Sequence, residues 1–242
     1  MKQIWIIAKR ELNSFFDSLL AYIMLVAFLG FTGFFTWISG RDVFLVGEAS
    51  MQSFFAVAYW TLFLFIPALT MKLIAEEKNT GTIEFILTKP VSDLQFVTGK
   101  FLSVFVLIVI TLVLTLPYYI TIASIGPIDH GAVWTGYLGL LLMSAAYISI
   151  GVFASSITNN QIVSFLFALL IGIFFHLLFD IIAQNFHGAI GNAITYLSIS
   201  THYQSISRGV VDSKDIIYFV SIVFVGLMGA EAFLMKRNLS DN

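Results

Sequence analysis

The chain has 242 residues, of which 59% are hydrophobic and only 11% are charged, and its mean hydropathy is +0.94. A soluble globular domain carries about 25% charged residues, so this composition indicates an integral membrane protein. One crossing of the hydrocarbon core takes about 20 apolar residues, which leaves room for six spans with short loops and none for a separate soluble domain. The net charge of −2 does not suggest nucleic acid as a partner, and the absence of cysteine excludes disulfides and thiol chemistry.

Residues 2–17 are predicted to form an amphipathic helix at the membrane interface. Such a helix seats a bundle among lipid headgroups, although an amphipathic extension of the first span explains the pattern equally well. Charged residues at 9–11 interrupt the first apolar run and no small-residue cleavage site follows, so no cleavable signal peptide is expected. On a helical projection, the apolar side carries Trp5, Ala8, Leu12, Phe15, Phe16 and Leu19, and the polar side carries Lys2, Lys9, Asn13 and Asp17.

Six apolar stretches predict a single all-α transmembrane domain that occupies residues 1–242. Pro67 should bend the second span, because proline lacks an N–H and its ring clashes with the preceding turn. The fourth span is rich in Gly, Ala and Ser, which let helices approach closely in lipid; this predicts packing inside the bundle, with a subunit interface as the alternative. The segment 183–215 is largely polar and contains a piece at 189–197 that is too short to span. The spans are expected at about 19–38, 51–75, 101–124, 133–156, 161–182 and 216–235.

A polar interruption at residues 71–100 separates the second and third spans. Its apolar residues recur at helical spacing from Ile83 to Leu87, which predicts a short amphipathic helix that the following proline ends. Residues 92–95 have the pattern of a capping box, so the next helix is expected to begin at Asp93. A short helix at the mouth of a membrane bundle suits docking better than catalysis.

The distribution of basic residues predicts the orientation, because Lys and Arg near the ends of spans favour the cytoplasm. With both termini in the cytoplasm, nine of the twelve basic residues lie inside and only Arg41, Arg208 and Lys214 lie outside. This arrangement also places the 71–100 segment and the turn at Thr158 on the cytoplasmic side. Asn160, at the end of that turn, is predicted to cap the helix of the fifth span.

Residues of the 71–100 segment form a pattern with a definite order and spacing: Glu76, Glu77, Gly81, Thr82, Ile83, Glu84, Leu87, Pro90, Leu94, Gly99 and Lys100. This pattern resembles the first cytoplasmic loop of ABC-2 type transporter permeases, in which a helix couples the permease to its ATPase. The six-span layout extends the resemblance over the whole chain, as do the late residues His202, Tyr203, Ser207, Arg208, Gly209, Val210 and Asp212.

The resemblance implies a coupling helix at about Thr82 to Lys89 in a permease of the bacterial inner membrane. It implies that this chain binds no cofactor, and that ATP and Mg are held by a separate ATPase chain. Expected partners are that ATPase, a second copy of the permease or a homologous permease, an additional membrane subunit, and membrane lipid. Without the resemblance, the charges of this segment are explained as solvated loop charges. The ATPase contacts that it implies are Glu76, Glu77, Gly81, Thr82, Ile83, Glu84 and Leu87.

Two ionisable residues, His176 and Asp180, stand four residues apart in the fifth predicted span and so share one helix face. Ionisable groups in a bilayer are costly, which makes them candidates for a substrate pathway or a gate; a satisfied structural pair is the alternative. No third ligand accompanies them at metal spacing, so no metal site is predicted. Glu231 is expected to pair with the basic residues at 236–237, or to contact a partner subunit.

The chain contains no GxxxxGK[ST] motif, so it does not hydrolyse ATP through a Walker motif. No catalytic residue is predicted, because His202, Tyr203 and Arg208 have no nucleophile motif or paired carboxylate near them. The sequence therefore favours a permease subunit that depends on a separate ATPase. The alternative is a membrane-embedded hydrolase or lipid-modifying transferase that uses His176, Asp180 or His202. An ion-coupled carrier would show internal repeats and broken helices, and neither is clear here.

Overall fold

The computed structural model describes residues 2–39, 43, 47–87, 90–186 and 188–240. Within this part of the chain every regular element is helical, and six helical stretches are long and apolar enough to cross a membrane. The predicted fold class, an all-α membrane protein with six spans, is therefore confirmed. The six stretches are Leu19–Trp37, Gln52–Asn79, Asp93–Ile125, His130–Ile157, Gln161–Ala183 and Ser213–Lys236.

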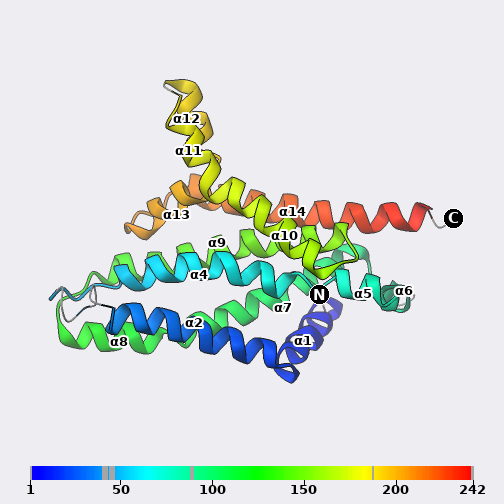
Figure 1. Cartoon of the computed structure of the whole chain (residues 1–242), viewed down its shortest axis with the longest axis horizontal. Helices are drawn as coiled ribbons and strands as arrows, with labels where there is room; N and C mark the ends of the chain where they lie inside the picture. Colours follow the sequence, from blue (N-terminus) through cyan, green and yellow to red (C-terminus); the bar gives the residue numbers. More distant parts are fainter. Residues whose placement is uncertain (1, 40–42, 44–46, 88–89, 187, 241–242) are drawn as a thin grey trace.

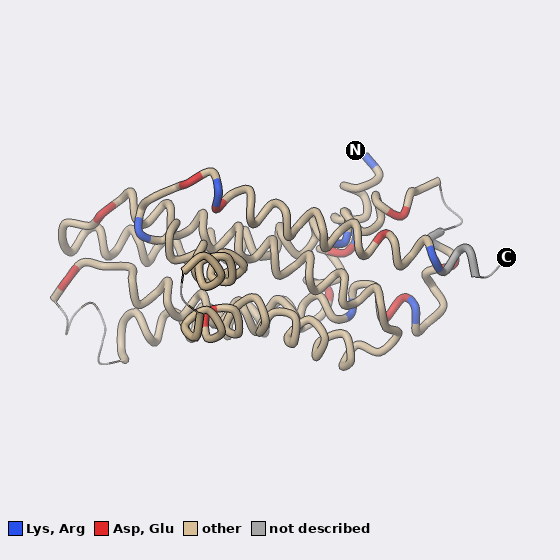
Figure 2. Tube along the Cα trace, turned by 90° about the horizontal axis from the view of Figure 1, so that it is seen from above, with Lys and Arg blue, Asp and Glu red and all other residues tan. Residues whose placement is uncertain are grey.

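The helices form an elongated bundle with two distinct ends (Figure 1). One end, called here the α5–α6 end, holds α5, α6 and the C-terminus; the opposite end, called the α13 end, holds α13 and the connection between α8 and α9. Charged residues gather toward the two ends (Figure 2). The elements are α1 (Lys2–Asp17), α2 (Leu19–Trp37), α4 (Gln52–Thr70), α5 (Ala75–Asn79), α6 (Thr82–Leu87), α7 (Asp93–Val113), α8 (Leu116–Ile125), α9 (His130–Ile157), α10 (Gln161–Ile173), the π-helical turn η1 (Phe174–Leu178), α11 (Phe179–Ala183), α12 (Ala189–Thr195), α13 (Ile199–Ser207) and α14 (Ser213–Ser240).

Helix α9 is the centre of the bundle and packs against α4, α7, α10, α13 and α14. Its glycines explain how so many neighbours come close. A Cβ atom added at Gly136 would lie 2.6 Å from the ring of Phe55 on α4, and one at Gly151 would lie 2.0 Å from Thr70 Oγ1. The small residues of this span therefore serve packing inside the chain, as the sequence predicts.

Two predicted spans are interrupted in the structure. Helix α4 ends at Thr70, short of the predicted boundary at 75, and a turn separates it from α5. Helix α7 ends at Val113 and α8 begins at Leu116, although 101–124 is predicted as one span. The reason is Pro117, which has no N–H to donate to the carbonyl of Val113 four residues earlier.

Three local signals read from the sequence have the predicted outcome. The Ser92 hydroxyl accepts from the backbone N–H of Gln95 and the Gln95 side chain accepts from the N–H of Ser92, so the capping box starts α7 at Asp93. The side chain of Asn160 accepts from two backbone N–H groups and starts α10. The piece predicted at 189–197 is a short helix, α12, which projects away from the bundle together with α11 (Figure 1).

Helix α1 has the predicted bounds. Ala8 and Phe15 of the predicted apolar side are buried, whereas Trp5 of the same side is half exposed. Ile7, which lies off that side, is also buried, because α1 packs tightly on α7: a Cβ atom at Gly99 would lie 2.7 Å from Ile7 Cγ2. The neighbouring helix therefore shifts the buried face away from the one that the hydrophobic pattern alone predicts.

The packing of α9 on α4 generates a stability prediction. Gly151→Ala should lower the free energy of unfolding by about 1–3 kcal/mol, which is typical of overpacking, because the new methyl group collides with buried Thr70. The measurement is unfolding of the purified protein in detergent, followed by circular dichroism.

The matched control is Gly30→Ala in α2, where a Cβ atom would meet nothing within 4 Å. This variant should unfold no earlier than the wild type, because alanine favours helix over glycine. Equal destabilisation by the two substitutions would contradict the close approach at Gly151.

Candidate functional site

The segment that the sequence predicts to be a coupling loop forms two short helices at the α5–α6 end. Gly81 joins them with a φ of +72°, in the left-handed region that glycine adopts without steric cost. Ile83 is fully buried, whereas Glu76, Thr82 and Glu84 are exposed and Phe85 is 75% exposed. The described part of the predicted coupling helix ends at Leu87, whose side chain lies outside the described residues, as do residues 88–89.

A serine at the end of α9 holds the start of α5. The Ser155 hydroxyl accepts hydrogen bonds from the backbone N–H groups of Ile74 and Ala75 and donates one to the carbonyl oxygen of Met71, all of 3.0 Å. The Lys78 ammonium donates to the carbonyl oxygen of Ser156. These bonds take the place of helical ones in the turn after α4, and they fix the α5–α6 segment to α9.

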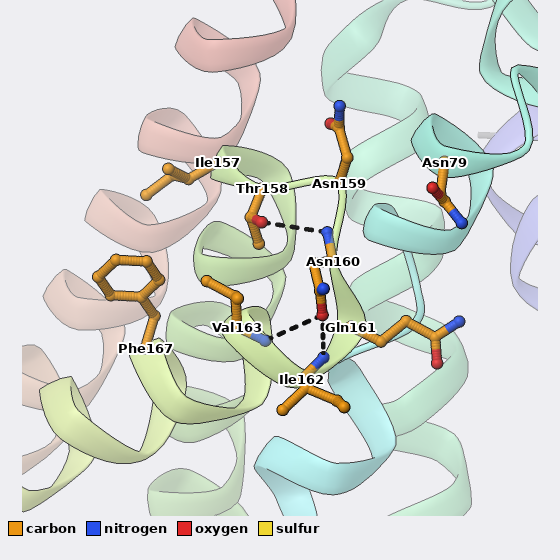
Figure 3. A pocket seen from close by; sticks show the side chains of 9 residues that line it. All are labelled: Asn79, Ile157, Thr158, Asn159, Asn160, Gln161, Ile162, Val163 and Phe167. Carbon is orange, nitrogen blue, oxygen red and sulfur yellow. Dashed lines mark hydrogen bonds between the residues drawn. The ribbon is translucent and has the colours of Figure 1, made fainter.

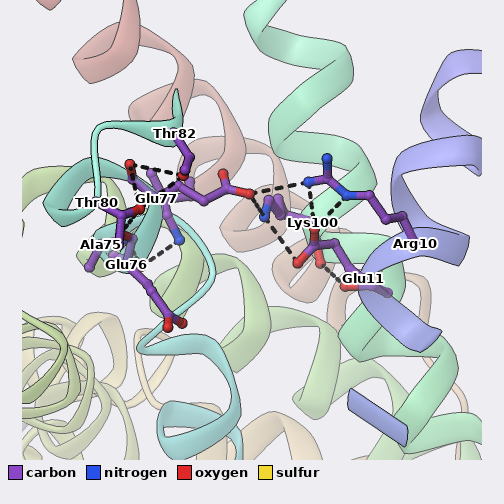
Figure 4. Close-up of polar contacts among 11 residues, drawn as sticks. Arg10, Glu11, Ala75, Glu76, Glu77, Thr80, Thr82 and Lys100 are labelled. Carbon is purple, nitrogen blue, oxygen red and sulfur yellow. Dashed lines mark hydrogen bonds and ion pairs between the residues drawn. The ribbon is translucent and has the colours of Figure 1, made fainter. Parts of the chain in front are cut away.

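An ion cluster of Arg10, Glu11, Glu77 and Lys100 joins α1, α5 and α7 (Figure 4). The Lys100 ammonium is buried and lies 2.6 Å from Glu77 Oε1 and 3.0 Å from Glu11 Oε2. The Arg10 guanidinium contacts the same two carboxylates, Glu11 at 2.7 Å and Glu77 at 3.2 Å. Burial alone would raise the pKa of the Glu11 carboxyl, but the charge of Lys100 and the hydrogen bonds from both cations hold that pKa below its ordinary value.

The cluster divides the predicted ATPase contacts into two groups. Glu77 turns inward to Lys100 and Arg10, and Ile83 is buried on the inner side of α6. Both residues therefore support the segment from within the chain. Glu76, Thr82 and Glu84 remain on its surface. The ion cluster is not evident from sequence, because its members come from three separate stretches. The one available signal is the pair of adjacent opposite charges at Arg10 and Glu11 in the middle of the amphipathic helix α1.

A groove of about 790 Å³ lies beside α5, at the turn between α9 and α10 (Figure 3). The turn is rigid, because the Thr158 hydroxyl accepts from the backbone N–H of Asn160 and the Asn160 side chain caps α10. The groove is lined by Asn79, Ile157, Thr158, Asn159, Asn160, Gln161, Ile162, Val163 and Phe167. The groove therefore places the polar groups of the α9–α10 turn next to Asn79 at the end of α5.

The predicted pair in the fifth span, His176 and Asp180, has two different hydrogen-bond partners in the structure. His176 lies in the π-helical turn and shares a 2.5 Å hydrogen bond with Tyr147 through Nδ1. Asp180 accepts a hydrogen bond of 3.3 Å from the Thr201 hydroxyl. Both residues line a second cavity near the α13 end, so they share a site without bonding to each other.

A buried histidine–aspartate contact that the sequence does not predict joins α13 to α14. His202 Nδ1 lies 2.6 Å from Asp215 Oδ1, and its ring stacks on Tyr218 with the centroids 3.9 Å apart. Glu231 is half-buried in α14. Among the described residues no ion pair joins it to Lys236, and because the side chain of Arg237 lies outside them, that half of the expected pairing stays a prediction. Among the side chains that the structure describes, no three of His, Asp and Glu group closely enough to hold a metal ion.

The ion cluster generates a second prediction. Lys100→Met should destabilise the protein by about 3 kcal/mol, because it leaves two partly buried carboxylates without their buried cation. The measurement is again unfolding in detergent, and adding Glu77→Gln to the variant should restore part of the loss. Lys214→Met is the control, since its ion pair with Asp212 is exposed and should contribute nothing measurable. Equal stabilities of Lys100→Met and the wild type would contradict the role of the cluster.

Comparison with known proteins bears on these features together. No curated protein matches the chain. The family model described as ABC-2 family transporter protein matches residues 43–235, from before α4 nearly to the end of α14. The match therefore includes the α5–α6 segment and both cavities, and it leaves out α1 and α2. The chain belongs to the ABC-2 transporter family, whose membrane components have no catalytic activity of their own and work with a separate ATPase.

Proposed function

We propose that this chain is the transmembrane subunit that receives the ATPase at its α5–α6 end and converts ATP-driven movement into transport. The observation that carries the proposal is the construction of this segment. It presents Glu84 and Phe85 outward, while Ser155 and Lys100 tie its inner side to the long helices. An exposed aromatic side chain next to exposed carboxylates is a surface suited to protein contact.

A rigid-body movement fits this construction. Helices in a bilayer satisfy their backbone hydrogen bonds internally and cannot unfold to let a substrate pass. Force applied to α6 reaches α9 through Ser155 and reaches α1 and α7 through the ion cluster. We infer that closure of the ATPase tilts these helices together and opens a pathway.

The proposed docking surface consists of the outward residues of the segment and the neighbouring groove. Phe85 and the groove are additions to the sequence prediction. Glu77 and Ile83 act behind the surface, and Gly81 shapes the turn between the two helices. The surface comprises Glu76, Thr82, Glu84 and Phe85, with Leu87 retained as a predicted contact, together with the α9–α10 turn at 158–163.

Orientation, compartment and assembly complete the proposal. The excess of basic residues near the α5–α6 end supports a cytoplasmic location for that end and for both termini. We place the chain in the bacterial inner membrane, paired with a second copy or a homologous permease and with ATP and Mg on the ATPase. Within the family, the sequence resembles the gliding-motility permease of bacteria that crawl on surfaces. That system would supply an additional membrane subunit.

The alternative of a membrane-embedded enzyme does not fit the family, whose membrane components are not catalytic. Its candidate residues also lack a reactive arrangement. His176 is held by Tyr147 among aromatic rings and His202 is held by Asp215. The intramembrane residues His176 and Asp180 are better explained by binding than by catalysis.

The test is co-purification of the tagged chain from its own membranes in a mild detergent. The wild type should bring down a chain with a Walker motif, identified by mass spectrometry, together with ATP hydrolysis. Glu84→Arg and Phe85→Asp should each reduce recovery of that ATPase at least about tenfold, because a reversed or newly buried charge at an interface costs several kcal/mol.

Val210→Asp is the matched control, since Val210 is an exposed apolar residue three positions after the end of α13. It should leave ATPase recovery unchanged. Loss of the ATPase in the Val210 variant, or its retention in both α6 variants, would exclude this surface as the docking site.

A further inference from the structure

The cavity near the α13 end has no role in ATPase docking. It has a volume of about 760 Å³, within the range of sites that hold small organic ligands. Its walls come from α4, the start of α9, the π-helical turn with α11, and α13. Polar and aromatic side chains line it, although most of the surrounding spans are apolar. Polar groups are costly inside a membrane bundle, so their presence indicates a function.

His176 is the first such side chain. It is 1% exposed, and its ring is stacked between Tyr59 and Phe63 with centroids 4.3 Å and 4.4 Å away. Nδ1 is bonded to Tyr147, whereas Nε2 has no hydrogen-bond partner among the described residues. A buried polar atom without a partner is costly and rare in native structures.

His176 lines the cavity wall together with Trp60, whose ring lies edge-on to the imidazole with the centroids 4.7 Å apart. Nε2 itself is covered and has less than 1 Å² of accessible surface. The π-helical turn carries His176 in a helix that is otherwise regular. Such single turns occur frequently at functional sites.

Asp180 is the second side chain. Its only hydrogen bond within the described part of the chain is the long one from Thr201, and no basic side chain there lies within ion-pair distance. A carboxylate on an apolar spanning helix is expensive unless a cation accompanies it. Arg208 lines the same cavity but forms no ion pair with Asp180, so this carboxylate is available to the positive charge of a ligand.

Trp60 supplies a third feature of the wall. Tyr59 has both ring faces covered, by His176 and by Tyr203, and so it acts as structural support. Trp60 lines the same cavity and is 48% exposed, which leaves ring surface available. Aromatic faces attract organic cations, indole most strongly.

We propose that this cavity binds the organic ammonium group of the transported molecule, with Asp180 as its counterion and Trp60 as its aromatic contact. The side chains of Gln204 and Arg208, which line the same cavity, receive the polar atoms next to that group, and His176 supports the wall behind Trp60. The inference deepens the proposed transport function, because it names the chemical class of the cargo. The adjoining surface of α10, η1 and α11 exposes Ile173, Phe174 and Ile181, against which an acyl chain can lie.

The experiment is calorimetric titration of the purified full chain, without ATPase, in an uncharged sugar detergent. The probes are lysophosphatidylethanolamine, lysophosphatidylglycerol with the same acyl chain, and free ethanolamine. The first two differ only in whether the headgroup ends in an ammonium or a diol. Preference for the ammonium lipid by at least about tenfold is expected, since a hydrogen bond to a charged group contributes about 1.5–3 kcal/mol.

Free ethanolamine separates the two sources of an ammonium group. Binding of the lipid but not of ethanolamine indicates an amphiphilic cargo, and equal binding of both indicates a small soluble amine. Either result supports an ammonium site. Equal affinity for the two lipids, or no binding of any probe, overturns it.

Asp180→Asn removes the charge and keeps the shape, and should abolish the preference for the ammonium lipid. Asp212→Asn removes an exposed carboxylate near the same end of the bundle, outside the cavity, and should leave the preference intact. Trp60→Leu, at a half-exposed position that tolerates substitution, should weaken binding about threefold. An unchanged preference in both cavity variants would overturn the assignment, whereas failure of ATPase docking alone would leave it standing.

Discussion

The buried ammonium of Lys100 is the constraint on which the α5–α6 end depends. A charge at that depth must be neutralised by nearby carboxylates, and here they come from two other helices, Glu11 on α1 and Glu77 on α5. This requirement brings together segments far apart in sequence. It explains why α1 packs tightly on α7 at Gly99, and why Glu77, although part of the family pattern, is turned away from solvent.

The α5–α6 segment is therefore both exposed and braced. A loop held only by its two connections would move under an applied force without passing it on. Here the Ser155 hydroxyl replaces helical hydrogen bonds at the start of α5, and Lys78 adds a bond to the same end of α9. The small size of α6, six residues, is no obstacle, because a short helix is stabilised by tertiary contacts rather than by its own propensity.

Local sequence signals predict what local physics determines. Hydropathy places the six spans, and the side chains of Ser92 and Asn160 start two of their helices, because those effects act within a few residues. The missing N–H of Pro117 also predicts the break between α7 and α8, whereas hydropathy alone predicts one continuous span there. The ion cluster and the Ser155 bonds depend on contacts between distant stretches, and no pattern within one stretch reveals them. The π-helical turn at His176 likewise depends on the aromatic rings around it.

Helix α9 connects the two candidate sites. Tyr147, which holds His176 beside the cavity, and Ser155, which holds α5, lie eight residues apart on this helix, or about 12 Å along its axis. A helix packed on neighbours along its whole length moves as a unit, so a displacement of α5 reaches the Tyr147–His176 contact without any flexible element between them. If the cavity binds the cargo, the same short stretch of α9 that receives force from the ATPase also supports the wall of the binding site. Coupling then requires only that this wall differ between the two positions of α9.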